Sequence, residues 1–418
     1  MHIRDPIHGA IEITPGERRL IDSRAMQRLR HIKQLGFAEL AFPGATHSRY
    51  AHALGAMAVA TRVFDAALRE APLAPAERGR MRQAVRVAVL FHDLGHPPLS
   101  HTTELALPPL GALALPEWLV DDPGRQASHE DMTLKLILDS ELASVLERSL
   151  SDCALTATDL ASLLTGRTPP SGAPFVAGGV DYGPVLRQIV SSELDADRMD
   201  YLLRDSLFTG VNYGKFDLDW IVQNLCHVVR EESAWLALQR RAIFAFEDFL
   251  LSRYHMFMSV YFHRTSIGYE AMLRRWFEES SDAYRLPADP QAYLGCDDVE
   301  LWSALRGSAS EWARRIVERR AYKVVYEEHP KDPHQAPAVE SALRAAGLPV
   351  IVRRSKGEVS KYFGARRGIF VRTERDVVPV ESYTPLFERY AEAAVLVRIY
   401  VPPEVREEAR TVVARVLS

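Results

Sequence analysis

The sequence has little cysteine, and its few thiols are widely separated. Cys153, Cys226 and Cys296 are its three cysteines, and none belongs to a Cys-x-x-Cys pattern. Small disulfide-bonded folds need several cysteine pairs, and thiolate zinc sites need short Cys-x-x-Cys spacings, so the sequence predicts neither. A reducing cytoplasm is the compartment that this composition fits best.

Long apolar runs and a strong excess of one charge are also missing. No apolar stretch approaches the length of a membrane-spanning helix, and Asp5 and Pro6 stand where a secretory signal needs its apolar core. We therefore expect a soluble, unprocessed chain. The formal net charge of −4 argues against stable, non-specific binding of nucleic acid, but it leaves room for a local basic pocket that binds a small anion.

Helical spacing of apolar residues dominates most of the chain, which has 47% hydrophobic and 25% charged residues. This spacing predicts helices over about 15–35, 48–68, 78–95 and 185–206, a helix opening at 128, and a nearly unbroken helix over 244–279. Two stretches rich in proline and glycine interrupt the pattern. We expect 105–126 to be only partly ordered and 165–183 to be a long mobile loop.

The character of the sequence changes beyond about residue 321. Short β-like runs at 322–328, 349–354, 368–373 and 393–401 alternate with helical patterns at 337–347 and 402–417. We therefore predict a mainly α protein, with a helical domain over 1–320 and a small α+β lobe over 321–418.

Histidine is concentrated in "VLFHDLGHPPLSH", residues 89–101. In a helix, His92 and His96 would share one face, with Asp93 beside His92 near the helix end. His52 in "SRYAHALG" and Asp197 in "ELDADRMDY" are further candidate ligands. Mixed imidazole and carboxylate ligation favours manganese, iron, magnesium or zinc over a thiolate-bound metal.

Each of these residues also has a structural interpretation. His52 alone is consistent with a buried histidine whose hydrogen bonds are made within the protein. Asp197 alone is consistent with a residue on a solvent-exposed acidic helix face. That interpretation is weakest for "HDLGH", since three ionisable groups in five residues are costly to bury without a cation or a paired network.

Ordered motifs between Arg4 and about Glu270 resemble those of a known family. "RDPIHGAIEI", "HDLGHPPLSH", "SHED" and "DADRMDYLLRDS" follow one another as in the HD-domain phosphohydrolases, specifically the deoxynucleoside triphosphate triphosphohydrolases. The resemblance implies a helical HD-domain phosphohydrolase core. It also implies a divalent cation, with manganese, iron or magnesium favoured over zinc, held by His52, His92, Asp93 and Asp197.

The resemblance further assigns roles around a nucleotide. We expect His101, held by Glu104, to act as the general acid, and His96 and His129 to donate to phosphate oxygens. The residues expected to bind substrate are Arg49, Arg198 and Arg253 at the phosphates, and Gln34, Leu35, Tyr201, Asp205 and Tyr261 around the sugar.

The spacing of Arg253, Phe257 and Tyr261 agrees with these roles in part. They lie at i, i+4 and i+8 of the expected helix, so one face would present a guanidinium and a phenol ring. The alternative for Tyr261 is a plain core aromatic, and we expect Phe257 to belong to the core.

The expected activity is metal-dependent hydrolysis of deoxynucleoside triphosphates by attack of metal-bound hydroxide on the α-phosphorus, releasing a deoxynucleoside and inorganic triphosphate. Crowding by Leu35 and Tyr261 at the 2′ position would favour deoxyribose. The alternatives are another phosphate ester as substrate, or a non-catalytic nucleotide-sensing scaffold.

The resemblance also implies homo-oligomers, either dimers or tetramers, and an activating guanine nucleotide. Asp22 and Arg30 match two residues of the activator site, but Met1 stands where that site has a basic residue, so this basic residue is absent. Asp22 alternatively belongs to a helix N-cap.

Overall fold

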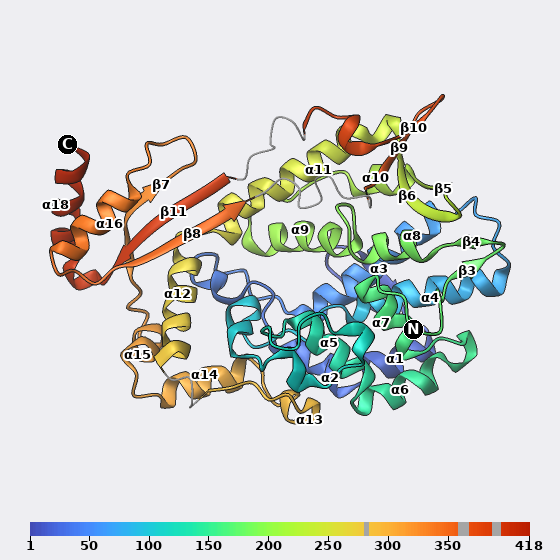
Figure 1. Cartoon of the computed structure of the whole chain (residues 1–418), viewed down its shortest axis with the longest axis horizontal. Helices are drawn as coiled ribbons and strands as arrows, with labels where there is room; N and C mark the ends of the chain where they lie inside the picture. The colour runs from blue at the N-terminus through green and yellow to red at the C-terminus, as the bar shows by residue number, and fades with distance from the viewer. Residues whose placement is uncertain (280–283, 358–367, 387–393) are drawn as a thin grey trace.

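The computed structural model describes residues 1–279, 284–357, 368–386 and 394–418, and it confirms a mainly α-helical fold (Figure 1). The helices of the main body are α1 (Pro15–Ile21), α2 (Arg24–Arg28), α3 (Arg49–Ala67), α4 (Pro75–Phe91), α5 (His129–Leu138), α6 (Glu141–Leu150), α7 (Ala157–Thr165), α8 (Gly183–Val190), α9 (Ala196–Thr209), α10 (Leu218–Gln223), α11 (Ile243–Met256), α12 (Arg264–Glu279), α13 (Pro290–Tyr293), α14 (Asp298–Gly307) and α15 (Glu311–Val317). No helix among the described residues is both long enough and apolar enough to cross a bilayer.

Helices α3, α4 and α9 form the centre of the body. Their apolar side chains are buried, and α3 packs closely on α9 because Gly55 has no side chain. A Cβ atom at Gly55 would lie 2.1 Å from both the Asp200 carboxylate and the Arg204 guanidinium. This close approach brings α9 against the helix that carries His52.

The first helical prediction is interrupted. Residues 15–35 form α1, α2 and the 3-10 turn η1 (Leu29–His31), because Ser23 ends one helix and caps the next by accepting from the Met26 amide. Asp22 is the C-cap of α1, so its interpretation as an N-cap residue was wrong.

Helix α4 ends at Phe91, four residues before the expected end at Gly95. His92 is its C-cap, so His92 and His96 do not share a helix face as predicted. Gly95 lies against α5, where a Cβ atom would be 2.1 Å from the His129 carbonyl oxygen and 2.3 Å from the Thr133 amide. The turn after α4 therefore carries the histidines toward α5.

The long helix expected over 244–279 is broken. Helix α11 passes into a π-helical turn, η8 (Phe257–Tyr261), and α12 begins only at Arg264. The Phe262 carbonyl accepts from the Arg398 guanidinium, and the His263 ring accepts from the Thr265 amide at 3.3 Å. These side chains satisfy backbone groups that a continuous helix would have paired.

The two interruptions rich in proline and glycine contain regular structure. Residues 105–126 include the 3-10 turns η4 (Leu110–Leu113) and η5 (Glu117–Leu119), with Leu110 and Leu113 fully buried. Residues 165–183 include the strands β3 (Val176–Ala177) and β4 (Val180–Asp181).

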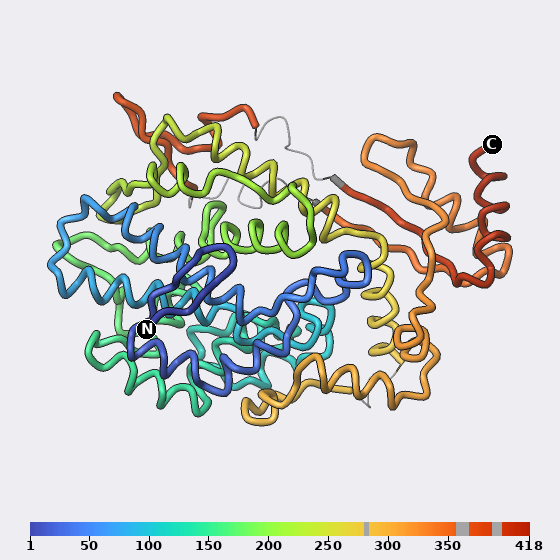
Figure 2. Tube along the Cα trace, turned by 180° about the vertical axis from the view of Figure 1, so that it is seen from behind, coloured from blue at the N-terminus to red at the C-terminus, as the bar shows by residue number. Residues whose placement is uncertain are grey.

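The N-terminal hairpin and a mixed sheet were not predicted. The hairpin pairs β1 (His2–Asp5) with β2 (Gly9–Glu12) and lies against the helical body, as the view from behind shows (Figure 2). The sheet has the order β10-β9-β6-β4-β3, where β10 is Val377–Pro379, β9 is Phe370–Arg372 and β6 is Ser233–Gln239. Strand β5 (Leu225–Arg230) also pairs with β6.

The C-terminal residues contain the predicted mixture of strands and helices. Strands β7 (Lys323–Glu328), β11 (Ala394–Val401) and β8 (Ile351–Gly357) form an antiparallel sheet that packs with α16 (Ala336–Ala345) and α18 (Arg406–Leu417). Strands β9 (Phe370–Arg372) and β10 (Val377–Pro379) instead join the sheet of β6 in the main body. The division at residue 320 stays a prediction.

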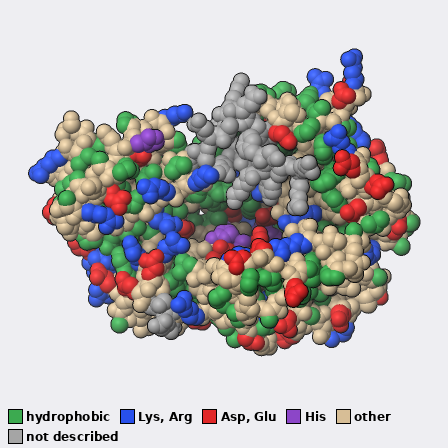
Figure 3. Space-filling view, in the orientation of Figure 1, with side chains coloured by type: hydrophobic (Ala, Val, Ile, Leu, Met, Phe, Trp, Pro, Cys, Tyr) green, Lys and Arg blue, Asp and Glu red, His purple; other side chains and the backbone are tan. Residues whose placement is uncertain are grey.

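Between the main body and the C-terminal sheet the surface is hollowed, and histidine side chains are visible in the hollow (Figure 3). The candidate site lies there.

Candidate metal centre and substrate cleft

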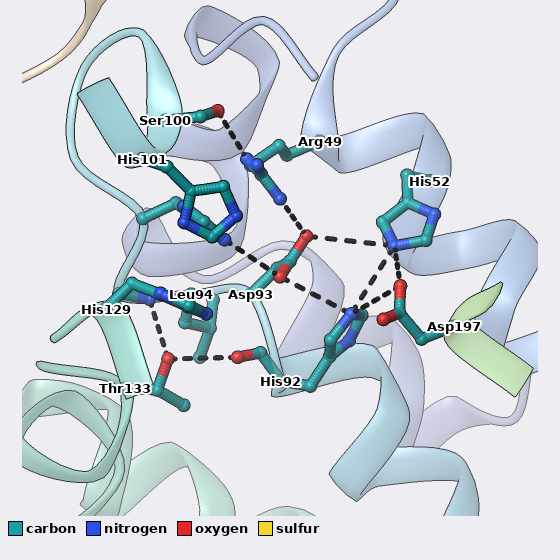
Figure 4. Close-up of polar contacts among 12 residues, drawn as sticks. Arg49, His52, His92, Asp93, Leu94, Ser100, His101, His129, Thr133 and Asp197 are labelled. Atoms are coloured by element: carbon teal, nitrogen blue, oxygen red, sulfur yellow. Dashed lines mark hydrogen bonds and ion pairs between the residues drawn. The ribbon is translucent and has the colours of Figure 1, made fainter. Parts of the chain in front are cut away.

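The four predicted metal ligands converge, although they come from three different parts of the chain (Figure 4). His52 on α3 has its Nε2 atom 2.9 Å from Asp197 Oδ1 on α9 and 3.4 Å from His92 Nε2 after α4. The Asp93 carboxylate lies 3.7 Å from His52 Nε2 and 3.4 Å from His92 Nε2. The donor atoms of His52, His92 and Asp197 lie close enough together to share one cation, and the Asp93 carboxylate lies beside this group.

The ring orientation of both histidines suits metal binding. The Nδ1–H group of His52 faces the buried carboxylate of Asp200 at 2.7 Å, and that of His92 faces the Val89 carbonyl oxygen at 2.6 Å. Each of these hydrogen bonds leaves Nε2 directed at the carboxylates. Such outer partners fix the tautomer and orientation of a metal-binding imidazole.

The electrostatics of the cluster are those of a site built for positive charge. Burial alone would lower the pKa of His52, but its hydrogen bonds to Asp197 and Asp200 raise it to about 10. Burial also opposes protonation of His92, yet the Asp93 and Asp197 carboxylates raise its pKa to about 9. A divalent cation among these donors would replace the protons that now balance the carboxylates, so the residues present fit a metal.

Arg49 connects the metal centre to the substrate side. Its guanidinium donates to the Asp93 carboxylate and, at 2.8 Å, to the Ser100 hydroxyl. Burial opposes ionisation of Asp93, but Arg49 and the neighbouring histidines hold its pKa well below the usual range. Asp93 is therefore an anion, as a metal ligand must be.

A second cluster of histidines lies beside the first. The rings of His96 and His129 stack with their centroids 3.9 Å apart, and the His101 ring meets both edge-on. Glu104 joins two of them, since its Oε1 atom lies 3.2 Å from His101 Nδ1 and also accepts from His129. Burial, Arg49 and His129 together lower the pKa of His96, so its imidazole is neutral.

Both clusters open into one cleft of about 880 Å³. Three of the metal ligands and all but one of the other predicted site residues line it: His92, Asp93, Asp197, His96, His101, His129, Arg49, Gln34, Leu35, Arg198, Tyr201, Asp205, Arg253 and Tyr261. The exceptions are His52, which is fully buried behind Asp197, and Glu104, which lies behind the two histidines that it contacts. Phe257, which we expected to belong to the core, also lines the cleft.

Two of the predicted phosphate-binding arginines share one acidic neighbour. The guanidinium groups of Arg198 and Arg253 lie 3.6 and 3.5 Å from Glu193 Oε1, and all three side chains are largely buried. Arg253 also lies over the Phe257 ring, 5.3 Å from its centroid. These contacts position two positively charged guanidinium groups along the wall of the cleft.

The sugar-side residues form a hydrogen-bonded chain. The Tyr261 hydroxyl donates to Asp205 at 2.8 Å, and the His47 ring contacts the other oxygen of Asp205 at the same distance. The Tyr201 and Tyr261 rings meet edge-on. Burial and the Asp205 charge raise the pKa of Tyr261 well above its usual range, so its hydroxyl stays a donor.

The residues matched to an activator site do not belong to this cleft. Asp22 pairs with Arg18 on the surface, and the Arg30 guanidinium lies 3.7 Å from the centroid of the Tyr50 ring. A role for Asp22 and Arg30 in binding a nucleotide stays a prediction.

Sequence reasoning missed the residues that support the ligands. Asp200 is fully buried and accepts from His52, from His8 and from Arg204. It falls inside the motif "ELDADRMDY", but one turn of helix after Asp197 it resembles a further member of the same acidic face. No spacing could have placed His8 beside it, since the two are 192 residues apart.

Comparisons with known proteins find a matching family region and several relatives. Residues 216–341 match a family described as the HD associated region. The chain is 31% identical over 321 residues to an uncharacterized protein of Methanocaldococcus jannaschii, covering 77% of this chain and 58% of that protein. It is 27% identical over 364 residues to the human protein named deoxynucleoside triphosphate triphosphohydrolase SAMHD1, covering 78% of this chain and 55% of that protein. The chain thus spans a little over half the length of these relatives.

Solved structures share the fold over nearly the whole chain. A hypothetical protein from Aquifex aeolicus has a TM-score of 0.77 and 28% identity, with 99% of both chains covered. A phosphohydrolase from Bacteroides thetaiotaomicron has a TM-score of 0.70 and 21% identity, covering 96% of this chain and 99% of that one, which shows the fold alone. The chain is therefore similar in sequence to proteins that include a named deoxynucleoside triphosphate triphosphohydrolase, and it shares its fold with both solved structures.

Proposed function

We propose that this protein is a metal-dependent phosphohydrolase that converts deoxynucleoside triphosphates to deoxynucleosides and inorganic triphosphate. One observation carries the proposal: the imidazole and carboxylate cluster and the neighbouring histidine cluster open into the same arginine-lined cleft. The similarity to the human triphosphohydrolase supports this substrate class.

His52, His92, Asp93 and Asp197 would hold the divalent cation. A cation bound there activates water as a nucleophile at neutral pH. Asp200 and the Val89 carbonyl keep both Nε2 atoms available, and Arg49 keeps Asp93 ionised. These contacts prepare the site before a substrate arrives.

The arginines bind the phosphate chain. Arg49 lies next to the metal centre, and Arg198 and Arg253 lie along the cleft beside Glu193. Charge-assisted hydrogen bonds from guanidinium groups neutralise the phosphate oxygens and stabilise charge that develops during attack on the α-phosphorus.

His101 supplies the proton that the leaving 5′-oxygen requires. Its Nδ1 atom faces Glu104, so Nε2 is the atom that delivers the proton when the bond between phosphorus and O5′ breaks. His96 and His129 are stacked beside it and can donate to the phosphate oxygens. Zinc, manganese, iron and magnesium are all compatible with these ligands and with these roles of the histidines.

The sugar would lie between Leu35, Tyr201, Asp205 and Tyr261. The Asp205 carboxylate is already oriented by two partners and offers an acceptor for the 3′-hydroxyl. Exclusion of a 2′-hydroxyl by crowding alone is worth roughly a hundredfold in discrimination. Gln34, next to Leu35, completes this side of the cleft.

Chromatography of reactions with each deoxynucleoside triphosphate and manganese tests the proposal directly. We expect equal amounts of deoxynucleoside and inorganic triphosphate. A monophosphate product would indicate a different phosphohydrolase. No product with any substrate, even when guanosine triphosphate is added as an activator, would favour a nucleotide-sensing scaffold. Sedimentation in the same buffers would test the proposed dimer or tetramer.

A further inference from the structure

A second, smaller cavity lies beside the cleft and has no role in the chemistry described above. Its volume is about 300 Å³, at the lower end of the range of small-molecule sites, which is about 300–1,000 Å³. Residues of α7, α8 and β6 line it, together with the 3-10 turn η9 (Val380–Ser382). Arg167, Arg187 and Ser191 line both this space, which we call the side cavity, and the cleft. The two are therefore neighbours.

Glu193 separates the side cavity from the phosphate side of the cleft. It lines the side cavity, whereas Arg198 and Arg253, whose guanidinium groups lie 3.6 and 3.5 Å from its Oε1 atom, line the cleft. Since Oε1 faces these guanidinium groups, Oε2 is the carboxylate oxygen left for the side cavity.

The Oε2 atom of Glu193 lacks a partner. It forms no hydrogen bond with any residue that the structure describes, although Glu193 is only 6% exposed. Buried polar atoms are nearly always hydrogen-bonded, because an unpaired one keeps the full cost of its desolvation. This oxygen therefore points to a ligand that brings an N–H donor into the side cavity.

The charges around the side cavity favour a positively charged ligand. Among the described residues, three carboxylates and two guanidinium groups line it: those of Asp181, Glu193, Glu381, Arg167 and Arg187. Both guanidinium groups are engaged by backbone, since Arg167 donates to the Trp118 carbonyl at 3.3 Å and Arg187 donates to the Leu163 carbonyl at 3.2 Å. The carboxylates are therefore the charged groups left to pair with a ligand.

The remaining wall is apolar and partly aromatic. Phe175, Trp235, Ile369 and Val380 contribute to it, and Trp235 on β6 is only partly buried by its neighbours. Aromatic rings bind flat apolar groups and attract cations to their faces. A ligand with a flat body and a cationic end would match both parts of the lining.

From these observations we propose that the side cavity is a regulatory site for a compact organic cation. The ligand carries an amidinium or primary ammonium group, which pairs with Glu193, on a flat apolar body, which packs near Trp235. Its charge lies behind Arg198 and Arg253, where it offsets the negative charge of Glu193. These guanidinium groups then attract phosphate more strongly. This coupling rests on the proposed function, because it takes the cleft to bind a triphosphate, whereas occupation of the side cavity does not.

Titration with small cations tests the site itself. Ligand-observed NMR with the full chain would give Kd for benzamidine, an amidinium, and benzylamine, an ammonium, with benzoate as the anionic control of similar shape. We expect both cations to bind at least about tenfold more tightly than benzoate, because only they pair with a buried carboxylate.

Variants locate the bound cation. Glu193→Gln should weaken benzamidine binding about tenfold or more, and Trp235→Leu should weaken it about threefold or more. Glu130→Gln is the matched control, because Glu130 is a carboxylate that lines the cleft instead, and it should leave the affinity unchanged. Melting temperatures would verify that each variant is folded, and Trp235→Leu keeps the test decisive if Glu193→Gln does not fold.

Calorimetry with inorganic triphosphate tests the coupling. In excess chelator and at matched ionic strength, saturating benzamidine should tighten triphosphate binding to the wild type about fivefold or more, and triphosphate should tighten benzamidine binding by the same factor. Glu193→Gln should bind triphosphate more tightly than the wild type does, and benzamidine should add nothing further.

Equal binding of benzamidine and benzoate, benzamidine affinity that survives in both variants, or binding without any effect on triphosphate would overturn the inference. If the cations do not bind while deoxynucleotides are still converted to triphosphate, the side cavity is rejected and the proposed function stands. If Glu193 is needed for cation binding in a protein that releases no triphosphate from any nucleotide, the proposed function fails and the side cavity stands.

Discussion

The most constrained side chain of the metal centre is His52, whose two ring nitrogens each face a carboxylate. Asp197 meets Nε2 at 2.9 Å, and Asp200 meets Nδ1 at 2.7 Å. Only the second contact survives when a cation takes the place of the proton on Nε2. Asp200 therefore determines how well His52 serves as a ligand.

Replacing Asp200 should weaken metal binding without touching a ligand. We expect Asp200→Asn to raise Kd for manganese roughly tenfold to a hundredfold, because the charge that orients the His52 ring is lost. Calorimetric titration of the metal-free protein measures this. Asp205→Asn is the control, since Asp205 is a buried carboxylate on the same helix that contacts His47 and Tyr261 instead. Equal affinities in the two variants would contradict the role of Asp200.

The exposed His101 offers the opposite case, a residue needed for turnover but not for the metal. His101→Ala should keep the metal content of the wild type and slow triphosphate release by roughly a hundredfold, because the general acid is lost. Metal analysis tests the predicted metal content, and the product assay tests the predicted rate of triphosphate release. His334→Ala removes another exposed histidine and should change neither value. Unchanged turnover in His101→Ala would reject its role.

The residues that could be predicted are those whose chemistry is unusual in sequence. A dense group such as His92, Asp93 and His96 is costly to bury without a cation, so its spacing along the chain is enough to single it out. Asp200 and His47 do not stand out, because one acidic or imidazole side chain is ordinary until a distant partner is known.

At the scale of elements, the turn after α4 sets the geometry of both clusters. It is held against α5 by the Gly95 amide, which donates to the Thr133 hydroxyl at 2.9 Å. It is held against α13 by the Tyr293 hydroxyl, which donates to the Gly95 carbonyl at 2.7 Å. Because α5 begins at His129, the contact with α5 also places the second histidine cluster.

A methyl group at Gly95 should push the turn after α4 away from α5. Gly95→Ala places a Cβ atom within 2.1–2.3 Å of α5 backbone atoms, and we expect a loss of about 1–3 kcal/mol in the free energy of unfolding. Urea denaturation measures it. Gly79→Ala, on α4 with no described atom within 4 Å of the added Cβ, should be neutral or stabilising by up to about 1 kcal/mol. Similar effects at both positions would show that the contact is not needed.

A buried ion pair joins α1 to α4. Glu17 accepts from the Arg86 guanidinium at 2.5 and 2.8 Å, and both side chains are buried. Glu17→Gln should cost about 3–5 kcal/mol in the free energy of unfolding, because Arg86 would keep a buried charge without its partner. Disrupting the exposed pair of Arg18 and Asp22 with Asp22→Asn should cost less than about 1 kcal/mol.

The ion pair of Glu17 and Arg86 makes the free energy of unfolding depend on pH. Burial favours the neutral acid, but Arg86 holds the pKa of Glu17 below its usual value of 4.5 in the folded state. A lowered pKa means that the stabilisation is fully present above pH 4.5 and is lost as the pH falls through the folded value. The difference in unfolding free energy between wild type and Glu17→Gln should therefore shrink below pH 4.5. A difference that is constant with pH would contradict this.

Element types were easier to predict than their ends. Apolar periodicity located most helices and the C-terminal strands, since it follows from which face is buried. It missed the stop at Phe91 and the break at Phe262, because both depend on contacts with distant residues such as Thr133 and Arg398. The hairpin of β1 and β2 was missed because its short strands bury few residues.

At the scale of the whole molecule, the cleft is a product of long-range packing. Its walls come from the turn after α4 that carries His92 and Asp93, from α9, from α11 and α12, and from β8 in the C-terminal sheet. The ordered motifs indicated which residues would meet. The volume of the cleft and the pairing of β9 with β6 could be known only once the chain was folded.

A single cation bound jointly by His52, His92, Asp93 and Asp197 is the feature on which the proposed chemistry depends most. The direct measurement is the metal content of purified wild type and Asp197→Ala by mass spectrometry, paired with triphosphate release from the same samples. We predict about one divalent metal per chain in the wild type and loss of both metal and product in the variant. Triphosphate release that persists in metal-free protein, or full metal content in Asp197→Ala, would contradict the shared cation site.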